Sequence, residues 1–167
     1  MRTHYQYNMI QRHLNIDYVE YRSVEEMEPM DRELVAAAME ARKGSYSPYS
    51  KFSVGAALRL EDGTIVKGAN QENAAYPSGI CAERTAMFAA GANYPGKAFD
   101  TIAVIAGMHG ETCKDPASPC GACRQVMAEY QALGRRPLKV ILVGADRIYK
   151  FGEVDDILPF IFDSLEA

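Results

Sequence analysis

The sequence predicts an α/β domain in which helices pack on a mixed β-sheet. Two continuous apolar runs rich in β-branched residues, 101–107 and 138–143, are typical of strands buried on both faces of a sheet. A hairpin pattern precedes them, and segments of helix-forming residues lie between the strands. A hairpin followed by strands that alternate with helices indicates a layered α/β architecture.

The length and composition fit one such domain. The chain has 167 residues, of which 48% are hydrophobic and 24% are charged, so a mainly disordered chain is excluded. Residues 1–30 stand apart because they contain no glycine and several tyrosines, and we interpret them as an N-terminal extension that lies against the domain or swings from it. The domain itself is expected to span residues 31–167.

The domain is expected to begin with a helix that Asp31 caps at its N-terminus and that ends just before Gly44. The hairpin follows, and its strands are joined by Asp62-Gly63. We expect a type I′ turn there, because both residue types tolerate positive φ values. The hairpin strands span residues 54–60 and 64–69.

The second half alternates helices with strands. Alanine-rich segments predict the helices, and the apolar runs predict the central strands. In order, we expect a helix at 81–92, a strand at 101–107, a helix at 121–132, a strand at 138–143, a short strand at 147–151 and a last helical turn at 155–158.

Charge and hydropathy exclude several classes of partner. The formal net charge is −4, which argues against a nucleic acid or an anionic membrane. No apolar run approaches the roughly 18 residues that span a bilayer. The segment MRTHYQYNMIQRH lacks the apolar core of a secretory signal. We therefore expect a cytoplasmic protein.

The cysteines indicate a metal site. Cys120 and Cys123 are three residues apart at the predicted start of a helix, so that both sulfurs can reach one ion. Cys81 lies at the predicted start of another helix. If the two N-termini converge, their dipoles stabilise the thiolate forms that bind metal. Zinc held by three protein ligands keeps one position open for water, and Glu83 is placed to take a proton from that water.

Two other interpretations of the cysteines remain open. Cys113 could supply a fourth ligand and close a structural zinc site, although Glu83 would then have no role. A protein-binding zinc module would use the same ligands without catalysis. We expect Cys113 to be a free thiol in a polar loop.

The segments Cys81-Ala82-Glu83 and Pro119-Cys120-Gly121-Ala122-Cys123 match the three-cysteine form of the zinc deaminase signature. Together with SPYSKFSVGAAL, GANQENAAYPSGICAERTA, SPCGACRQVM and ILPFIF, they make the chain resemble the small homotetrameric cytidine deaminases of pyrimidine salvage. The resemblance runs from about Asp31 to Asp163. It implies a three-layer α/β/α fold, one zinc ion per chain, and deamination of cytidine and 2′-deoxycytidine.

The resemblance also implies a role for each matching residue. Cys81, Cys120 and Cys123 would bind zinc, and Glu83 would be the proton shuttle. The substrate would be bound by Phe52 on the pyrimidine ring, by Asn70 and Glu72 on the ribose hydroxyls, by Ala82 and Ser118 on the base, and by Tyr76 and Phe162 from neighbouring subunits. Active sites would then be shared between the subunits of a homotetramer. Phe160 and Ile161 are interpreted as packing on their own domain.

Charge refines the expected site. Three thiolates outweigh the charge of one zinc ion, and Arg84 beside the catalytic glutamate could compensate for the excess. Glu72 and the absence of a basic cluster in residues 70–76 disfavour a phosphate, so a nucleoside is expected rather than a nucleotide. The alternative within enzymes is a related zinc deaminase that acts on an aminonucleoside antibiotic. Nucleotide and nucleic-acid deaminases typically have histidine in place of Cys81.

Overall fold

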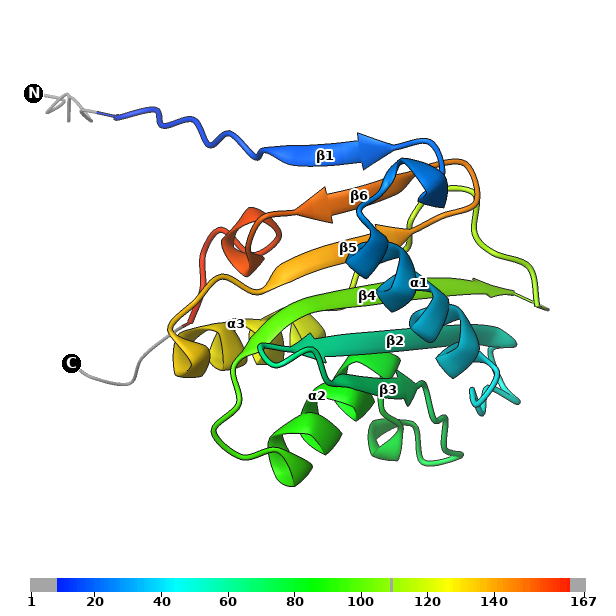
Figure 1. Cartoon of the computed structure of the whole chain (residues 1–167). Helices are drawn as coiled ribbons and strands as arrows, with labels where there is room; N and C mark the ends of the chain where they lie inside the picture. Colours follow the sequence, from blue (N-terminus) through cyan, green and yellow to red (C-terminus); the bar gives the residue numbers. More distant parts are fainter. Residues whose placement is uncertain (1–8, 109, 163–167) are drawn as a thin grey trace, which may run out of the picture.

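A six-stranded mixed sheet forms the centre of the protein. The computed structural model describes residues 9–108 and 110–162 (Figure 1). The strand order across the sheet is β1-β6-β5-β4-β2-β3, with β4 and β5 parallel and every other neighbouring pair antiparallel. The strands are β1 (Tyr18–Tyr21), β2 (Phe52–Leu60), β3 (Ile65–Ala69), β4 (Phe99–Met108), β5 (Lys139–Val143) and β6 (Ile148–Phe151).

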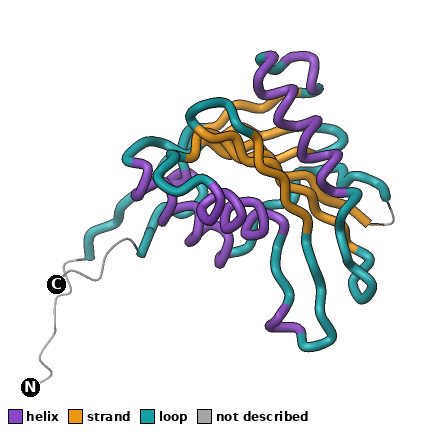
Figure 2. The backbone as a smooth tube through the Cα atoms, turned by 60° about the horizontal axis from the view of Figure 1, so that its bottom comes forward, coloured by secondary structure: helices purple, strands orange, loops and turns teal. Residues whose placement is uncertain are grey.

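Helices cover both faces of this sheet, which confirms the predicted three-layer α/β/α fold (Figure 2). Helix α1 (Pro29–Arg42) packs on one face, where Leu34 and Val35 meet Ile105 and Ile141. Helices α2 (Ala82–Asn93) and α3 (Gly121–Gly134) lie on the other face around Met87 and Met127. These buried apolar clusters hold the layers together.

The topology brings the N-termini of α2 and α3 to the same edge of the sheet. Strands β3 and β4 are both antiparallel to β2, which lies between them, so they run in the same direction. Helix α2 follows β3 and helix α3 follows β4. Both helices therefore begin near the carboxyl ends of strands that point the same way, where open α/β sheets commonly place their ligands.

Close packing fixes α2 on the sheet. A side chain on Gly68 in β3 would bring its Cβ to 2.4 Å from the carbonyl oxygen of Ala82 and from the amide nitrogen of Ala86. Only glycine allows the backbone of the strand to approach the first turn of the helix this closely. This contact sets the position of the residues at the start of α2.

The expected cap of the first helix is wrong. Helix α1 begins at Pro29 after Glu28, and Asp31 lies inside its first turn. Asp31 is buried, and its carboxylate pairs with Arg59, at 3.1 Å, and with Lys150. Proline at the first helical position supplies the start signal, because its missing amide hydrogen has no partner there anyway. The C-terminal expectation is confirmed, since Gly44 follows the C-cap Lys43.

The hairpin forms as predicted, but its turn is of another type. A type I′ turn needs positive φ at both central residues, and among the described residues Gly63 has a φ of 88° whereas Asp62 has no positive φ. Leu60 accepts a hydrogen bond from the Gly63 amide and donates to Thr64. The loop therefore has three residues and ends in a left-handed glycine.

The other predicted elements are confirmed within a few residues, with the last helical turn as a 3-10 turn at Val154–Asp156. Strand β1 was not expected. It pairs antiparallel with β6, and the Tyr18 ring packs edge-on against Tyr149 with a centroid distance of 5.1 Å. Part of the N-terminal extension is thus the edge strand of the sheet. No helix within the described ranges is long and apolar enough to cross a membrane.

Candidate active site

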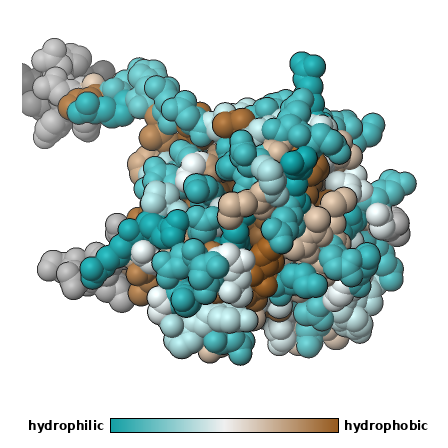
Figure 3. Space-filling view, viewed as in Figure 1, coloured by the Kyte–Doolittle hydropathy of each residue, from teal (hydrophilic) through white to brown (hydrophobic). Residues whose placement is uncertain are grey.

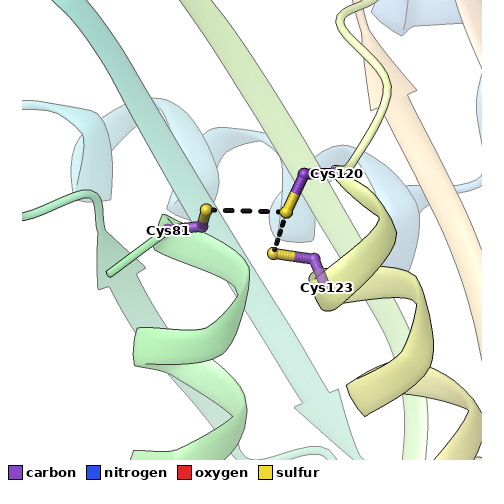
Figure 4. A group of neighbouring side chains, drawn as sticks. All are labelled: Cys81, Cys120 and Cys123. Carbon is purple, nitrogen blue, oxygen red and sulfur yellow. Dashed lines mark hydrogen bonds between the residues drawn. The ribbon is translucent and has the colours of Figure 1, made fainter. Parts of the chain in front are cut away.

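Three cysteine sulfurs meet where α2 and α3 begin (Figure 4). Cys81 is the N-cap residue of α2, Cys120 is the N-cap residue of α3, and Cys123 is buried in the first turn of α3. The Cys120 sulfur lies 3.8 Å from that of Cys81 and 3.4 Å from that of Cys123. All three sulfurs lie within 4.8 Å of one another.

This geometry fits a zinc ion. Tetrahedral coordination with Zn–S bonds of about 2.3 Å separates two sulfur ligands by about 3.8 Å. The observed separations are close to that value, and thiolates are ligands that zinc favours. Cys113 is described but is not a member of the group, which contradicts the closed four-cysteine site. A three-ligand site leaves one coordination position for water or substrate.

The surroundings favour ionisation of one thiol, that of Cys81. The hydrogen bond from Cys123, together with Arg84, lowers the pKa of Cys81 to about 5 against the opposing effect of burial. The same hydrogen bond and burial raise the pKa of Cys123, so Cys81 is the first of the pair to ionise. Both helix N-termini add positive potential at the cluster.

Arg84 is the cation nearest to the thiols. It lies in the first turn of α2, and its Nη2 atom donates to the Cys81 sulfur at 3.6 Å. This hydrogen bond and the charges of Cys81 and Cys123 raise the pKa of the guanidinium. Its Nε atom is buried and has no hydrogen-bond partner among the described residues. Arg84 is therefore held beside the sulfurs rather than in a surface ion pair, which supports its predicted role in charge compensation.

Glu83 lies beside the thiols and is almost fully buried, with 4% of its surface exposed. It lines the same cavity as Cys81 and Cys120. Burial raises the pKa of its carboxyl group, and the negative charge of Cys81 raises it further. A carboxyl group with a raised pKa, next to a metal-binding cluster, is suited to accept and return a proton.

A cavity of about 510 Å³ extends from the thiols to the loop before β2. Its volume lies within the range of pockets that hold small molecules. Apart from Glu83 and Arg84, the residues that line it carry few charges, and apolar side chains such as Val104 and Ile80 contribute much of the wall. Five of the predicted substrate-binding residues line this cavity: Phe52, Asn70, Glu72, Tyr76 and Ser118.

The far end of the cavity presents the carboxylate of Glu72 among the side-chain amides of Asn70, Gln71 and Asn73. The Oε2 atom of Glu72 accepts hydrogen bonds from the backbone amides of Tyr49, at 2.9 Å, and Ser50, at 3.3 Å. Hydrogen bonding to Ser50 and to these amides lowers the pKa of Glu72. Glu72 is therefore an ionised acceptor whose other oxygen is available to a ligand.

The side chain of Asn70 is fixed in one orientation. Its Oδ1 atom accepts from the Ser45 hydroxyl, at 2.5 Å, and from the Val54 amide, at 2.8 Å. Its Nδ2 atom donates to the carbonyl of Phe52 at 2.9 Å. Because an amide nitrogen carries two hydrogens, one donor of Asn70 remains for a ligand.

Two of the predicted substrate-binding residues do not contribute side chains to this cavity. Ala82 is fully buried in the first turn of α2, so only its backbone could face a ligand. Phe162 does not line the cavity, and 65% of its surface is exposed. Its carbonyl oxygen accepts a hydrogen bond from the Gln125 side chain on α3, at 2.6 Å.

The two other tail residues for which packing was expected, Phe160 and Ile161, differ in their burial. Ile161 packs against the α2–α3 side of the core, as expected. Phe160 is 88% exposed, so the expectation that it packs on its own domain is wrong within a single chain. A large aromatic side chain that is so exposed has no packing partner among the described residues of its own chain.

Several residues that shape the site were not predicted. The amides of Tyr49 and Ser50 hold Glu72, and the Ser45 hydroxyl holds Asn70. Arg124 on α3 donates to the carbonyls of Pro119 and Ile157 and so fixes the loop before Cys120. The serine-rich loop of residues 45–50 was the available signal, because short polar side chains in such loops often bond to nearby groups.

The fold and this cluster define a zinc-binding α/β domain with a buried carboxyl group beside an open metal position. Comparison with known families gives a narrower assignment. Residues 28–135 match the model described as the cytidine and deoxycytidylate deaminase zinc-binding region. The chain belongs to this family.

Individual relatives agree with this assignment. The chain is 52% identical over 101 residues to a cytidine deaminase of Halalkalibacterium halodurans, a match that covers 60% of this chain and 72% of that protein. It is 36% identical over 130 residues to a probable cytidine deaminase of Dictyostelium discoideum, covering 77% and 80% of the two chains. The crystal structure of cytidine deaminase from Burkholderia pseudomallei superposes with a TM-score of 0.65 at 46% identity, covering 78% of this chain and 97% of that one.

Proposed function

We propose that this protein is a zinc-dependent hydrolase that converts cytidine and 2′-deoxycytidine to uridine and 2′-deoxyuridine with release of ammonia. The observation that carries the proposal is the buried Glu83 carboxyl beside three converging thiols in a cavity of nucleoside size. Relatives that are 52% and 53% identical over about 100 residues are cytidine deaminases. A role in pyrimidine salvage, in the cytoplasm, is consistent with this activity.

The reaction needs a nucleophile and a way to move protons. Zinc held by Cys81, Cys120 and Cys123 would lower the pKa of a water molecule from about 16 toward neutrality, which supplies the nucleophile. Glu83 accepts the proton of the attacking water and delivers it to N3 of the pyrimidine ring. The same carboxylate then takes the second proton from the oxygen that has been added to the ring and transfers it to the amine, which leaves as ammonia. Its burial keeps bulk water from competing for these protons.

The chain's other residues orient the nucleoside. Phe52 stacks on the pyrimidine ring, and the carbonyl of Ser118 with the amides of Cys81 and Ala82 contact the base. At the opposite end, the remaining N–H of Asn70 donates a hydrogen bond to a ribose hydroxyl. The free oxygen of Glu72 accepts a hydrogen bond from a ribose hydroxyl. Tyr76 lies at this end of the cavity in its own chain and is 73% exposed, so it is also accessible to a neighbouring subunit.

Arg84 compensates for the excess charge of three thiolates. The positive charge of Arg84, in contact with Cys81, offsets part of the negative charge that would otherwise oppose ionisation of the nucleophilic water. The two helix N-termini contribute in the same direction.

Release of ammonia from cytidine, measured by a coupled assay, tests the proposed function. A protein-binding zinc module would bind zinc and release no ammonia. An aminonucleoside antibiotic deaminase would release ammonia from the antibiotic and leave cytidine intact. We expect turnover of cytidine and 2′-deoxycytidine, and the absence of both would refute the proposal.

Substrate selection should depend on the charge of Glu72. Cytidine 5′-monophosphate should be a poor substrate, because no Lys or Arg other than Arg84 lines the cavity and the ionised Glu72 repels phosphate. Glu72→Gln removes a charge-assisted hydrogen bond and should raise KM for cytidine about tenfold with a smaller change in kcat. Steady-state kinetics of both substrates measure this. Equal turnover of the monophosphate and the nucleoside would contradict the ribose assignment.

Assembly should matter for activity. We propose a homotetramer in which Phe162 of one chain completes the base pocket of another, because both Phe160 and Phe162 are exposed on the tail. Phe162→Ala should raise KM for cytidine severalfold while the zinc content stays at one per chain. Phe160→Ala is the matched control, since it removes the same aromatic ring from the same tail and should leave KM near the wild-type value.

The test of assembly combines analytical ultracentrifugation with kinetics. A sedimentation coefficient that corresponds to four chains is expected at assay concentrations. An active monomer, or normal kinetics in the Phe162→Ala protein, would rule out sites that are shared between chains.

A further inference from the structure

Residues 9–17, here called the N-terminal arm, project from the body of the protein (Figure 1, Figure 3). Every residue of the arm is exposed. Its four large apolar side chains have exposed fractions between 46% and 91%. Within the described part of the chain, no backbone or side-chain group of the arm makes a hydrogen bond. These four side chains are Met9, Ile10, Leu14 and Ile16.

The arm has the side-chain pattern of a β-strand. Ile10, Leu14, Ile16 and Tyr18 are separated by even numbers of residues, so an extended backbone places them on one face. Residues 11, 13, 15 and 17 between them are polar. The arm also leads directly into β1, the edge strand of the sheet. An amphipathic strand that continues a sheet edge is a template for pairing with another strand.

The apolar face of the arm points to the side of the sheet that carries α2 and α3. Tyr18 packs on Tyr149 and Phe151, which belong to the core on that side. Ile16 and Tyr18 line a groove of about 480 Å³ together with Pro119 and other residues beside α3. In a single chain the groove is therefore open, because Ile16 is the one residue of the arm that lines it.

From this geometry we propose that the arm pairs antiparallel with the arm of a second copy of this chain, about a two-fold axis at Asn15. In an antiparallel pair, residues directly opposite each other point to the same face. A register centred on Asn15 keeps Ile10, Leu14 and Ile16 of both arms on one face, whereas Met9 lies on the other. It sets Leu14 opposite Ile16 of the other copy. The second arm then places its Leu14 opposite Ile16 and its Arg12 opposite Tyr18, and both Ile16 and Tyr18 line the groove.

The polar side chains favour this register and this occupant. His13 is opposite Asp17 of the other copy, twice in the symmetric pair, and Arg12 is opposite the ring of Tyr18. A register centred on His13 would instead place two imidazoles opposite each other. A strand whose basic and acidic residues lie at equal distances on the two sides of Asn15 is complementary to itself, as a two-fold interface requires.

The arm also lies outside the part of the chain that matches the deaminase family. The match to the deaminase family begins at residue 28, after the arm and β1. The superposition with the Burkholderia pseudomallei structure covers 97% of that chain but only 78% of this one. The arm is thus outside the region that defines the deaminase domain, and its pairing does not depend on the function proposed above.

Cysteine cross-linking of the full-length protein tests the register. Asn15→Cys places two thiols directly opposite each other at a Cα separation of about 4.5–5.5 Å, which a disulfide can bridge. Leu14→Cys is the matched control, because its two copies are about 8 Å apart in this register, beyond the reach of a disulfide. After mild oxidation, non-reducing electrophoresis should show about tenfold more covalent dimer for Asn15→Cys than for Leu14→Cys. Equal yields, or a higher yield for Leu14→Cys, would overturn the proposal.

Charge reversal tests the partner in the same background. Asp17→Lys places a cation opposite His13 and should lower the cross-linking yield of Asn15→Cys severalfold. Adding His13→Glu to that protein restores an opposite-charge pair and should restore the yield. Oxidation in urea gives the yield from random collision. A native yield no higher than this value, or no recovery in the doubly charge-reversed protein, would show that the arms do not pair.

Discussion

Glu83→Gln should retain zinc and the native fold while losing at least about 10⁴-fold in kcat/KM for cytidine. General acid–base transfer by one side chain contributes about 10²–10⁴-fold, and in the proposed reaction this carboxyl group serves several transfers. Glutamine keeps the shape of the side chain but cannot accept and return a proton. The loss should therefore reach or exceed the upper end of that range.

The measurement combines ammonia release with metal analysis. Glu83 lines the cavity beside Cys81 and Cys120, so a small change in shape could also disturb the metal. An unchanged zinc content and melting temperature would separate a chemical role from a structural one. Glu129→Gln is the matched control, because Glu129 is exposed on α3 and should show wild-type kinetics. If Glu83→Gln kept a tenth of the activity, the carboxyl group would have no part in proton transfer.

Local spacing was enough to predict part of this site. Cys120 and Cys123 are three residues apart at a helix start, and the structure places their sulfurs 3.4 Å apart. The convergence of Cys81 with them required the resemblance or the structure, because it depends on β3 and β4 running in the same direction. No pattern of single residues encodes that long-range arrangement.

Other features could not be predicted because backbone groups or distant partners create them. Asp31 has the residue type of an N-cap, but burial beside Arg59 and Lys150 gives it ion pairs instead. The partners of Glu72 are backbone amides, which carry no residue-type signal. Strand β1 is short, and its partner β6 lies near the other end of the sequence. No local pattern predicts a contact between segments so far apart.

The ion pairs of Asp31 belong to a network that spans the sheet. Arg59 contacts both Asp31 and Asp100, at 3.1 and 3.0 Å, and Arg136 contacts Asp100 at 2.8 Å. Burial raises the pKa of Asp100, but hydrogen bonds from Thr101 and Arg59 and the positive charges of Lys139 and Arg59 outweigh it and leave the pKa below its ordinary value. The stability that this carboxylate adds is present above the pKa of the unfolded chain. It is lost as the pH falls through the lower pKa of the folded state.

Cys123→Ala and Cys113→Ala should differ sharply in zinc content and stability, although each removes one thiol. Cys123 is fully buried and its sulfur is part of the cluster, whereas Cys113 is not. Metal binding is coupled to folding, because the unfolded chain has no preformed site. Cys123→Ala should therefore lose most of the bound zinc and lower the melting temperature by about 10 °C or more, since each kcal/mol shifts it by roughly 2–4 °C in a domain of this size.

Cys113→Ala should keep one zinc ion per chain, measured by metal analysis after dialysis, and full activity, measured by ammonia release. Calorimetry gives the melting temperatures of both variants. The comparison is informative because both changes have the same chemistry, so that only the position of the thiol relative to the cluster differs. The wild-type protein with a chelator provides a third condition. If the cluster holds the metal, the chelator should lower the melting temperatures of the wild-type and Cys113→Ala proteins and have little effect on Cys123→Ala. Loss of zinc from Cys113→Ala would instead require a fourth cysteine ligand, and a closed site of that kind would leave no coordination position for the attacking water.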